Sequence, residues 1–245
     1  VALVTGGARR VGRAICLALA GRGCDVVLTR NTSAPEAEAT AREIESAGVD
    51  ARIAPLDLAD AARSADWGRA IAGELPRLDV LVHSASTYDP SPLDGLDLAH
   101  AEAQLRVNAL SPLALSAALA PLLARSPLRG GGAIVAMLDI HAAGLPRRDH
   151  AAYAMSKAAL GAMMRTLALE LAPSVRVNGV APGVVAWPES GPEADPTMQE
   201  RYLSRVPLGR AGTPEEAASA VAFLALDATY TTGAVLRVDG GRSLR

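Results

Sequence analysis

Short apolar runs alternate with longer amphipathic stretches along the whole chain. VALVT at residues 1–5 precedes VGRAICLALAGRG at 11–23, and DVVLT at 25–29 precedes APEAEATAREIESAG at 34–48; in the longer stretches apolar residues recur every three or four positions. Short apolar runs bounded by turn residues are typical of buried strands, and the longer period is typical of helices. The alternation predicts an α/β fold, with a doubly wound parallel sheet of about seven strands and helices on both faces.

The pattern predicts a single domain over residues 1–245, because no strict repeat and no linker interrupts it. One irregular segment, GVVAWPESGPEADP at 183–196, is too long for a plain connection. Long loops inside compact domains are usually functional or disordered. We therefore expect a substrate lid around 183–205, called the lid segment below.

Net charge and cysteine usage narrow the classes of partner. A formal net charge of −2 gives no cationic field for nucleic acid or acidic membranes, so neither partner is expected. No apolar run reaches the roughly 18 residues of a membrane span, and the chain opens on a strand without a charged leader. Cys16 and Cys24 match no metal-ligand spacing and are interpreted as small buried hydrophobes. We expect a reduced, cytoplasmic setting and no metal.

A glycine-rich turn, TGGARRVG at residues 5–12, joins the first predicted strand to the first predicted helix. Ligands of open parallel sheets bind beyond the carboxyl ends of the strands, where this turn lies. Glycines let the backbone approach a pyrophosphate, and the helix amino terminus offers N–H groups and a positive dipole end. The turn indicates a dinucleotide site, with a plain tight turn as the alternative.

The end of the second strand indicates which dinucleotide binds. An NAD site usually places an acid there for the ribose 2′-hydroxyl, but this strand ends LTRNTS at 28–33. Arg10 and Arg30 are instead positioned to pair with a 2′-phosphate, which suits a guanidinium fork. The sequence therefore predicts NADP(H), the alternative being that both arginines are solvated.

Tyr153 and Lys157 lie four residues apart in a helical stretch, so their side chains share one face. The ammonium can lower the pKa of the phenol and hold a cofactor ribose, leaving the tyrosine able to transfer a proton near neutral pH. Lys157 is the only lysine among 24 basic residues, which indicates that a compact ammonium is required there. Chance occurrence of this short pattern is the alternative.

These residues belong to a wider set of motifs. The set consists of TGGARRVGRAI, Asp57 in PLDLAD, HSAS at 83–86, Asn108 in VNALSP, YAMSK, RVNGVAPG and VDGG. Over nearly the whole chain it resembles the classical short-chain dehydrogenase/reductase family. The resemblance implies a single-domain Rossmann-type fold with strand order 3-2-1-4-5-6-7. It also implies a homotetramer built on helices at about 98–125 and 151–172 and on the last strand.

The resemblance implies roles for individual residues. Asn108, Tyr153 and Lys157 would form the catalytic proton relay, Asp57 would contact the adenine, and Pro182 and Gly183 would flank the nicotinamide. The residues expected to bind NADP(H) are Gly6, Arg9, Arg10, Val11, Gly12, Arg30, Asn31, Ser33, Asp57, Leu58, Ser84, Ala85, Pro182 and Gly183.

Three departures from the general family pattern point to one branch. Arg10 stands where most members have glycine, His83 where they have asparagine, and Asp139 where they have serine. Together these changes resemble the pteridine reductases, including the bacterial dihydromonapterin reductases. This resemblance implies NADPH-dependent reduction of a dihydropterin.

Asp139 follows the strand GAIVAML directly, at the edge of the sheet where a ligand is expected. A carboxylate would repel the charge that develops on a ketone oxygen, but it can serve a ring nitrogen or an amino-pyrimidinone edge. In the enzymes that this chain resembles, such an acid cooperates with the tyrosine in supplying protons. The alternative is that Asp139 only caps the strand end.

Further residues receive hypotheses from their place in the pattern. Tyr88 would sandwich a pterin or pack the loop, Ser86 would reach the substrate or the cofactor phosphates, and Trp187 would cover the pocket or a subunit contact. His83 and His141 are assigned no role. The basic tail GGRSLR motivates the hypothesis that Arg242 or Arg245 reaches a neighbouring subunit's active site.

Three functions remain open from the sequence. The first is a dihydropterin reductase with Asp139, Tyr153, Lys157 and Asn108 at its centre. The second is a carbonyl or 3-oxoacyl thioester reductase, against which Asp139 argues. The third is a non-catalytic NADP-binding sensor or scaffold, against which the Tyr153–Lys157 pair argues because a pure binding module needs no proton relay.

Overall fold

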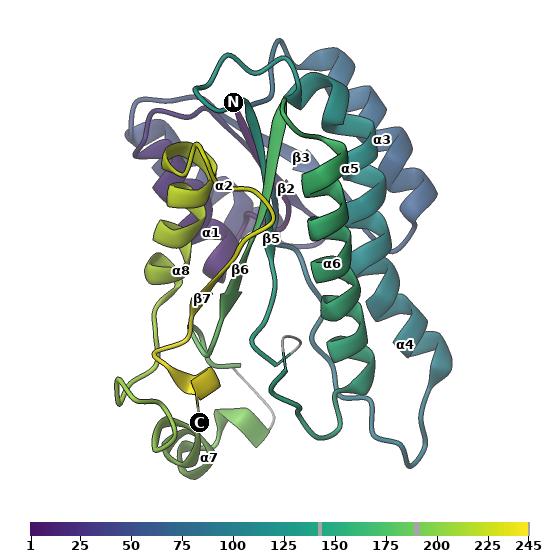
Figure 1. The fold of residues 1–245 in the computed structure, drawn as a ribbon, viewed down its shortest axis with the longest axis vertical. Coiled ribbons are helices and arrows are strands. Elements are labelled where there is room, and N and C mark those ends of the chain that lie inside the picture. The colour runs from purple at the N-terminus through teal and green to yellow at the C-terminus, as the bar shows by residue number, and fades with distance from the viewer. Residues whose placement is uncertain (142–143, 189–191, 245) are drawn as a thin grey trace.

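The computed structural model describes residues 1–141, 144–188 and 192–244, which form one α/β domain around a parallel sheet (Figure 1). The order β3-β2-β1-β4-β5-β6-β7 confirms the predicted strand order, and all paired strands are parallel. The strands are β1 (Ala2–Val4), β2 (Val26–Arg30), β3 (Ala51–Pro55), β4 (Val80–His83), β5 (Gly132–Met137), β6 (Val175–Pro182) and β7 (Val235–Val238).

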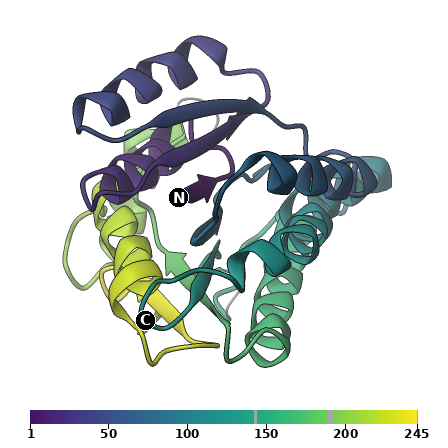
Figure 2. The same cartoon turned by 90° about the horizontal axis from the view of Figure 1, so that it is seen from above.

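Helices cover both faces of the sheet, as predicted (Figure 2). One face carries α1 (Arg10–Ala20), α2 (Ala34–Ser46) and α8 (Pro214–Ala222). The other face carries α3 (Ala61–Glu74), α4 (Leu98–Leu105), α5 (Ser111–Leu123) and α6 (Ala151–Glu170). The short α7 (Pro196–Leu203) lies at the end of the molecule where the strands finish (Figure 1). This carboxyl edge of the sheet is where ligands of open parallel sheets bind.

The alternation of side chains along each strand divides the core into two layers. Ala2 and Val4 pack with α1, α2 and α8, whereas Leu3 between them packs with the helices of the opposite face. Because both faces are covered, all three residues are buried and the strand has no polar face. Cys16 lies in the first layer, and burial raises the pKa of its thiol. Cys24 is half-buried.

A π-helical turn, Arg106–Leu110, joins α4 to α5 into one continuous helix. By length and composition alone, Leu98–Leu123 could cross a membrane, with mean hydropathy 1.3, but core helices of soluble proteins meet the same test. Here the helix packs beside α3 and α6. The turn carries the buried Asn108, and local π turns are frequent at functional sites.

Arg176 at the start of β6 caps the opposite end of the fold. Its buried guanidinium donates hydrogen bonds to the carbonyls of Leu224 and Ala225 at 2.7 Å and of Ala228 and Gly130 at 3.0 and 3.1 Å. Three of these carbonyls belong to the last turn after α8, where helical carbonyls lack partners. The arginine thus ties α8 to the sheet.

Replacing Arg176 with methionine is expected to lower the free energy of unfolding by about 2–4 kcal/mol, because several buried carbonyls lose their donors. Urea unfolding followed by circular dichroism measures this change. Arg176→Lys is the matched control, and its ammonium should restore part of the loss because it donates to fewer carbonyls. Unfolding of Arg176→Met within about 0.5 kcal/mol of wild type would contradict the assignment.

Candidate active site

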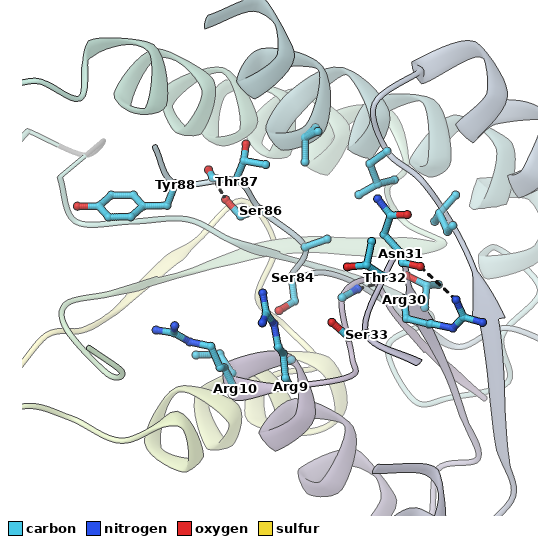
Figure 3. A pocket seen from close by; sticks show the side chains of 18 of the residues that line it. Arg9, Arg10, Arg30, Asn31, Thr32, Ser33, Ser84, Ser86, Thr87 and Tyr88 are labelled. Atoms are coloured by element: carbon cyan, nitrogen blue, oxygen red, sulfur yellow. Dashed lines mark hydrogen bonds between the residues drawn. The ribbon is translucent and has the colours of Figure 1, made fainter. Parts of the chain in front are cut away.

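Two adjoining cavities lie at the carboxyl edge of the sheet. The larger, of about 580 Å³, is bounded by the glycine turn, the end of β2 and the loop after β4 (Figure 3). Most of the residues predicted to bind a cofactor line it, namely Gly6, Arg9, Arg10, Val11, Gly12, Arg30, Asn31, Ser33, Asp57, Leu58, Ser84 and Ala85. Gly183 lines the smaller cavity instead, and Pro182 ends β6.

Gly6 and Gly12 of the glycine turn are packed so closely that neither position has room for a side chain. Gly6 has a φ of +65°, and a Cβ there would lie 2.9 Å from the Ala85 Cα. A Cβ on Gly12 would lie 2.0 Å from the Gly6 carbonyl oxygen. Among the residues that the structure describes, no side chain caps the amino terminus of α1, so its first N–H groups can bind an anion. The turn fits the pyrophosphate of a dinucleotide.

The far end of this cavity carries a guanidinium, that of Arg30 at the end of β2. Asp57 is the one acid among its described lining residues, and β2 ends without an acid. Arg30 donates to the Asn31 carbonyl at 3.1 Å, and its Nε has no partner among the residues that the structure describes. Arg30, Asn31 and Ser33 line this end and fit the 2′-phosphate of NADP(H).

Arg10 takes a different place from the one predicted. Its Nη2 donates hydrogen bonds of 3.1 Å to the carbonyls of Ala186 and Trp187 in the lid segment. Its side chain extends away from Arg30 (Figure 3), and it lines both cavities. The predicted pairing of Arg10 with a 2′-phosphate is therefore corrected, because lid carbonyls hold the guanidinium.

Asp139, Tyr153 and Lys157 meet at the edge of the sheet. The Tyr153 hydroxyl donates to Asp139 Oδ2 at 2.8 Å, so a side chain after β5 and one on α6 form a direct pair. Lys157, one turn along α6, donates to the Met137 carbonyl at 2.8 Å and lies 5.9 Å from the centre of the Tyr153 ring. Tyr153 and Lys157 are buried, with 6% and 4% of their surface exposed.

Burial sets the protonation of this group. It raises the pKa of Tyr153 well above the ordinary value, and the negative charge and hydrogen bond of Asp139 raise it further. Burial also lowers the pKa of Lys157 to about 8, against the opposing effect of Asp139. The expectation that Lys157 brings the phenol pKa toward neutrality is thus wrong for the protein alone, because burial and Asp139 raise that pKa well above its ordinary value. Tyr153 holds its proton and offers it to Asp139.

Asn108 lies nearby, but its side chain is fully engaged elsewhere. Nδ2 donates to the Thr87 carbonyl and to Ser156 Oγ, both at 2.9 Å. Oδ1 accepts from the Thr87 N–H at 2.9 Å and from Ser86 Oγ at 3.0 Å. These four bonds fill the capacity of an amide. Asn108 therefore ties the loop after β4 to α6, and its side chain reaches Tyr153 only through Ser156, which donates to the Tyr153 carbonyl.

The smaller cavity, of about 210 Å³, opens beside Asp139 and Tyr153. Tyr88 lines both cavities, with its ring 4.7 Å from Tyr153 edge-on and stacked at 4.8 Å on His150. Its hydroxyl donates to Glu193 at 2.8 Å, and burial raises its pKa to about 12. Tyr88 thus lies where the two cavities adjoin, and its contact with a pterin stays a prediction.

Ser86 and Trp187 do not line the smaller cavity. Ser86 lines the larger cavity and bonds to Asn108, whereas Trp187 lines neither cavity and meets the Tyr202 ring edge-on at 5.6 Å. Arg242 is buried in its own chain, 5.4 Å from the Tyr202 ring centre, so the hypothesis that it reaches a neighbour is corrected. Arg245 lies outside the described residues.

Several residues of the smaller cavity were not predicted. The polar ones are His141, Arg147, Glu193 and Tyr202. Arg147 pairs with Glu193 across two loops, and its guanidinium lies 5.6 Å from the Tyr88 ring centre. Tyr202 is one of only four tyrosines and falls within the lid segment, which is a signal that could have identified it. The Arg147–Glu193 pair joins loops 46 residues apart and has no sequence signature.

His83, another titratable residue, has a structural role. His83 is buried, with its Nε2 2.8 Å from Ser116 Oγ, and burial lowers its pKa to about 3. This agrees with the absence of an assigned role. Within the described ranges, no group of three or more histidine, cysteine or acidic side chains is arranged to hold a metal ion.

Comparison with known proteins covers nearly the whole chain. Residues 6–243 match the family described as enoyl-(acyl carrier protein) reductase. The cis-4-hydroxycyclohexanecarboxylate dehydrogenase of Sinomonas cyclohexanicum is 37% identical, over 98% of this chain and 95% of that protein. A putative ketoacyl reductase of granaticin polyketide synthase, from Streptomyces violaceoruber, is 36% identical over 100% and 96%.

A solved structure shows the same fold. The acetoin dehydrogenase YohF of Salmonella typhimurium superposes with a TM-score of 0.87 at 30% identity. The match covers 100% of this chain and 96% of that one. None of the three protein names mentions a pterin.

Proposed function

Because the chain belongs to the short-chain dehydrogenase/reductase family of oxidoreductases, we propose that it uses NADPH to reduce a dihydropterin. The observation that carries the proposal is the 2.8 Å hydrogen bond from the Tyr153 hydroxyl to Asp139. It supports a site that combines a proton donor with a carboxylate at the wall of the smaller cavity. The experiment that tests it is turnover of a dihydropterin by the purified protein, set out in the Discussion.

The cofactor would supply a hydride to the substrate when bound. The glycine turn and the amino terminus of α1 would hold its pyrophosphate, and Arg30 its 2′-phosphate. Lys157 would position the ribose as the family resemblance implies. The protein itself presents the phenol of Tyr153 to the smaller cavity.

Because of Asp139, this site suits the reduction of a C=N bond better than the reduction of a ketone. Reducing a C=N bond adds a hydride at carbon and a proton at nitrogen, and Tyr153 holds a proton for that transfer. Reducing a ketone instead builds negative charge on oxygen, which the Asp139 carboxylate would oppose. As the phenol gives up its proton, Asp139 accepts hydrogen bonds from the substrate's N–H groups and keeps the ring in position.

Reduction of a carbonyl or of a 3-oxoacyl thioester is the second candidate. The names of the relatives favour it, since they describe dehydrogenases and a putative ketoacyl reductase. It predicts that Asp139 is not required for turnover. A non-catalytic NADP-binding protein, the remaining alternative, would bind NADPH without oxidising it in the presence of any pterin or carbonyl compound.

Arg30→Ala is expected to raise the KM for NADPH by about 10- to 100-fold, the value of a hydrogen bond to a charged group. The KM for NADH should change little, because NADH lacks the 2′-phosphate. Initial rates with both cofactors measure the effect. Arg10→Ala is the control, since Arg10 contacts the lid carbonyls and should affect both cofactors alike. Equal losses for NADPH and NADH with Arg30→Ala would contradict the assignment.

The pH dependence of kcat/KM for reduction should reveal the ionisation of the Lys157 side chain. Its pKa of about 8 means that the folded protein carries the ammonium below this pH and loses it above. The ammonium stabilises the phenolate left when Tyr153 gives its proton, so kcat/KM for reduction should fall as the pH rises through about 8. Any activity left in Lys157→Arg should decline only above about pH 10, because a guanidinium stays charged up to that pH. A flat wild-type profile from pH 7 to pH 10 would oppose this role.

Assembly and location belong to the same proposal. We infer a homotetramer that works in the cytoplasm, with contacts formed by α4, α5, α6 and β7. Exposed apolar side chains on three of these elements support the interface, with exposures of 43% for Leu113, 82% for Leu169 and 38% for Leu236. Sedimentation equilibrium should give four times the chain mass of 25.1 kDa, and a monomer would refute the assembly.

A further inference from the structure

His141 lies two residues after Asp139 and lines the smaller cavity. Its backbone N–H donates to Asp139 Oδ1 at 2.7 Å, and its Nδ1 lies 2.9 Å from the Leu145 carbonyl oxygen. A carbonyl only accepts hydrogen bonds, so Nδ1 must carry the proton of this bond. In a neutral ring Nε2 is then an acceptor.

The Nε2 atom is buried and has no hydrogen-bond partner among the residues that the structure describes. Buried polar groups without a partner are rare and costly, and a specific one calls for an explanation. The ring lies 6.5 Å from that of Tyr202, another wall residue of the cavity. The unsatisfied nitrogen therefore belongs to a side chain in the wall of the smaller cavity.

The ring is uncharged at neutral pH. Burial lowers the pKa of His141, and the positive charges of Arg147 and Arg242 lower it further. The Asp139 carboxylate and the Leu145 carbonyl act in the opposite direction without reversing the shift. Nε2 accordingly keeps its lone pair under ordinary conditions.

We propose that His141 determines substrate specificity by accepting, at Nε2, a hydrogen bond from an N–H or O–H group of the substrate. Asp139 and His141 then form two neighbouring acceptors, which select a substrate with donor groups and reject one that presents only carbonyl oxygens. For a pterin, whose amino group and ring N–H lie side by side, the inference rests on the proposed function. The inference that the substrate carries an N–H or O–H donor does not depend on the proposed function.

His141→Asn tests the proposed hydrogen bond at Nε2 separately from the hydrogen bond at Nδ1. An asparagine amide replaces Nδ1 as the donor to the Leu145 carbonyl and leaves nothing at the place of Nε2. Its KM for a dihydropterin should rise by about 10- to 100-fold with kcat changed less than about 3-fold. The matched control is His141→Gln, whose amide reaches the place of Nε2 and should recover part of the affinity.

Two small ketones keep the test independent of the pterin proposal. Acetoin carries a hydroxyl beside its carbonyl, and diacetyl has none. His141→Asn should raise the KM for acetoin, and it should leave the KM for diacetyl unchanged or lower it, because diacetyl has no donor for the lost acceptor. Equal KM values for variant and wild type with every substrate would overturn the role of His141. Absence of dihydropterin turnover in wild type, with the acetoin effect present, would overturn only the proposed function.

A measurement on wild type covers the case in which His141→Asn does not fold. The chain has four histidines, whose ring nitrogens can be followed by ¹⁵N NMR. Adding a pterin, or acetoin where no pterin binds, to the NADP⁺-loaded protein should shift one neutral Nε2 signal. Binding without any such shift would overturn the inference.

Discussion

Tyr153→Phe is expected to reduce turnover by about 10²- to 10⁴-fold, the usual contribution of general acid catalysis. The hydroxyl that is lost is the one that donates to Asp139 at 2.8 Å. The phenylalanine ring keeps the edge-on contact with Tyr88 and the place beside Lys157, so the fold and cofactor binding should persist. Stopped-flow and steady-state rates of NADPH oxidation measure the loss.

Tyr202→Phe is the matched control for this variant. Tyr202 lines the same cavity but lies in α7, and the pair with Asp139 does not include it. It should lose far less activity than Tyr153→Phe. Tight NADPH binding by both variants, measured by fluorescence, would show that the effect belongs to the chemistry. If Tyr153→Phe kept more than a tenth of wild-type kcat, Tyr153 would not be the proton donor.

Asp139→Asn is expected to reduce dihydropterin turnover by about 10²-fold or more, as loss of a group that assists proton transfer does. The amide has the shape of the carboxylate, and its single oxygen can still accept from the His141 N–H. Its NH2 group replaces the oxygen that accepted from the Tyr153 hydroxyl. The variant therefore removes the charge and the acceptor of the Tyr153 bond while it keeps the size of the side chain. The kcat for a dihydropterin is the quantity to compare.

Thermal unfolding provides the control for Asp139→Asn, because an intact site predicts little change in Tm. The reduction of diacetyl provides a second control, since a ketone needs no acceptor at this place. Its rate should be preserved or increased when the charge that opposes the developing oxyanion is removed. Equal losses for dihydropterin and diacetyl would indicate a structural role for Asp139.

Much of the fold was predictable because parallel strands buried on both faces carry a strong signal. Runs such as VVLT cannot present a polar side, and the turns between them hold the residues that reach a ligand. Asp139 follows one such run, and Tyr153 lies in the first turn of the next helix. The resemblance to the pteridine reductases implied that the two cooperate, and the hydrogen bond between them shows that they meet.

Properties that depend on distant neighbours were not predictable. Arg10 was expected at a phosphate, but carbonyls 176 and 177 residues away hold its guanidinium. The pKa of Tyr153 rises because of burial, which no spacing of residues reveals. Asn108 matched a relay motif, yet its four hydrogen bonds depend on the loop at 86–87 and on Ser156.

The central claim is that Asp139 adapts this oxidoreductase to a dihydropterin. The most direct test is NADPH oxidation by wild type and Asp139→Ser, with dihydromonapterin or dihydrobiopterin beside an acetoacetyl thioester and diacetyl. The account predicts that wild type turns over the pterins and that Asp139→Ser abolishes this activity. Reduction of only the carbonyl compounds, with Asp139→Ser equal or faster, would contradict it and assign the protein to the carbonyl reductases of its family.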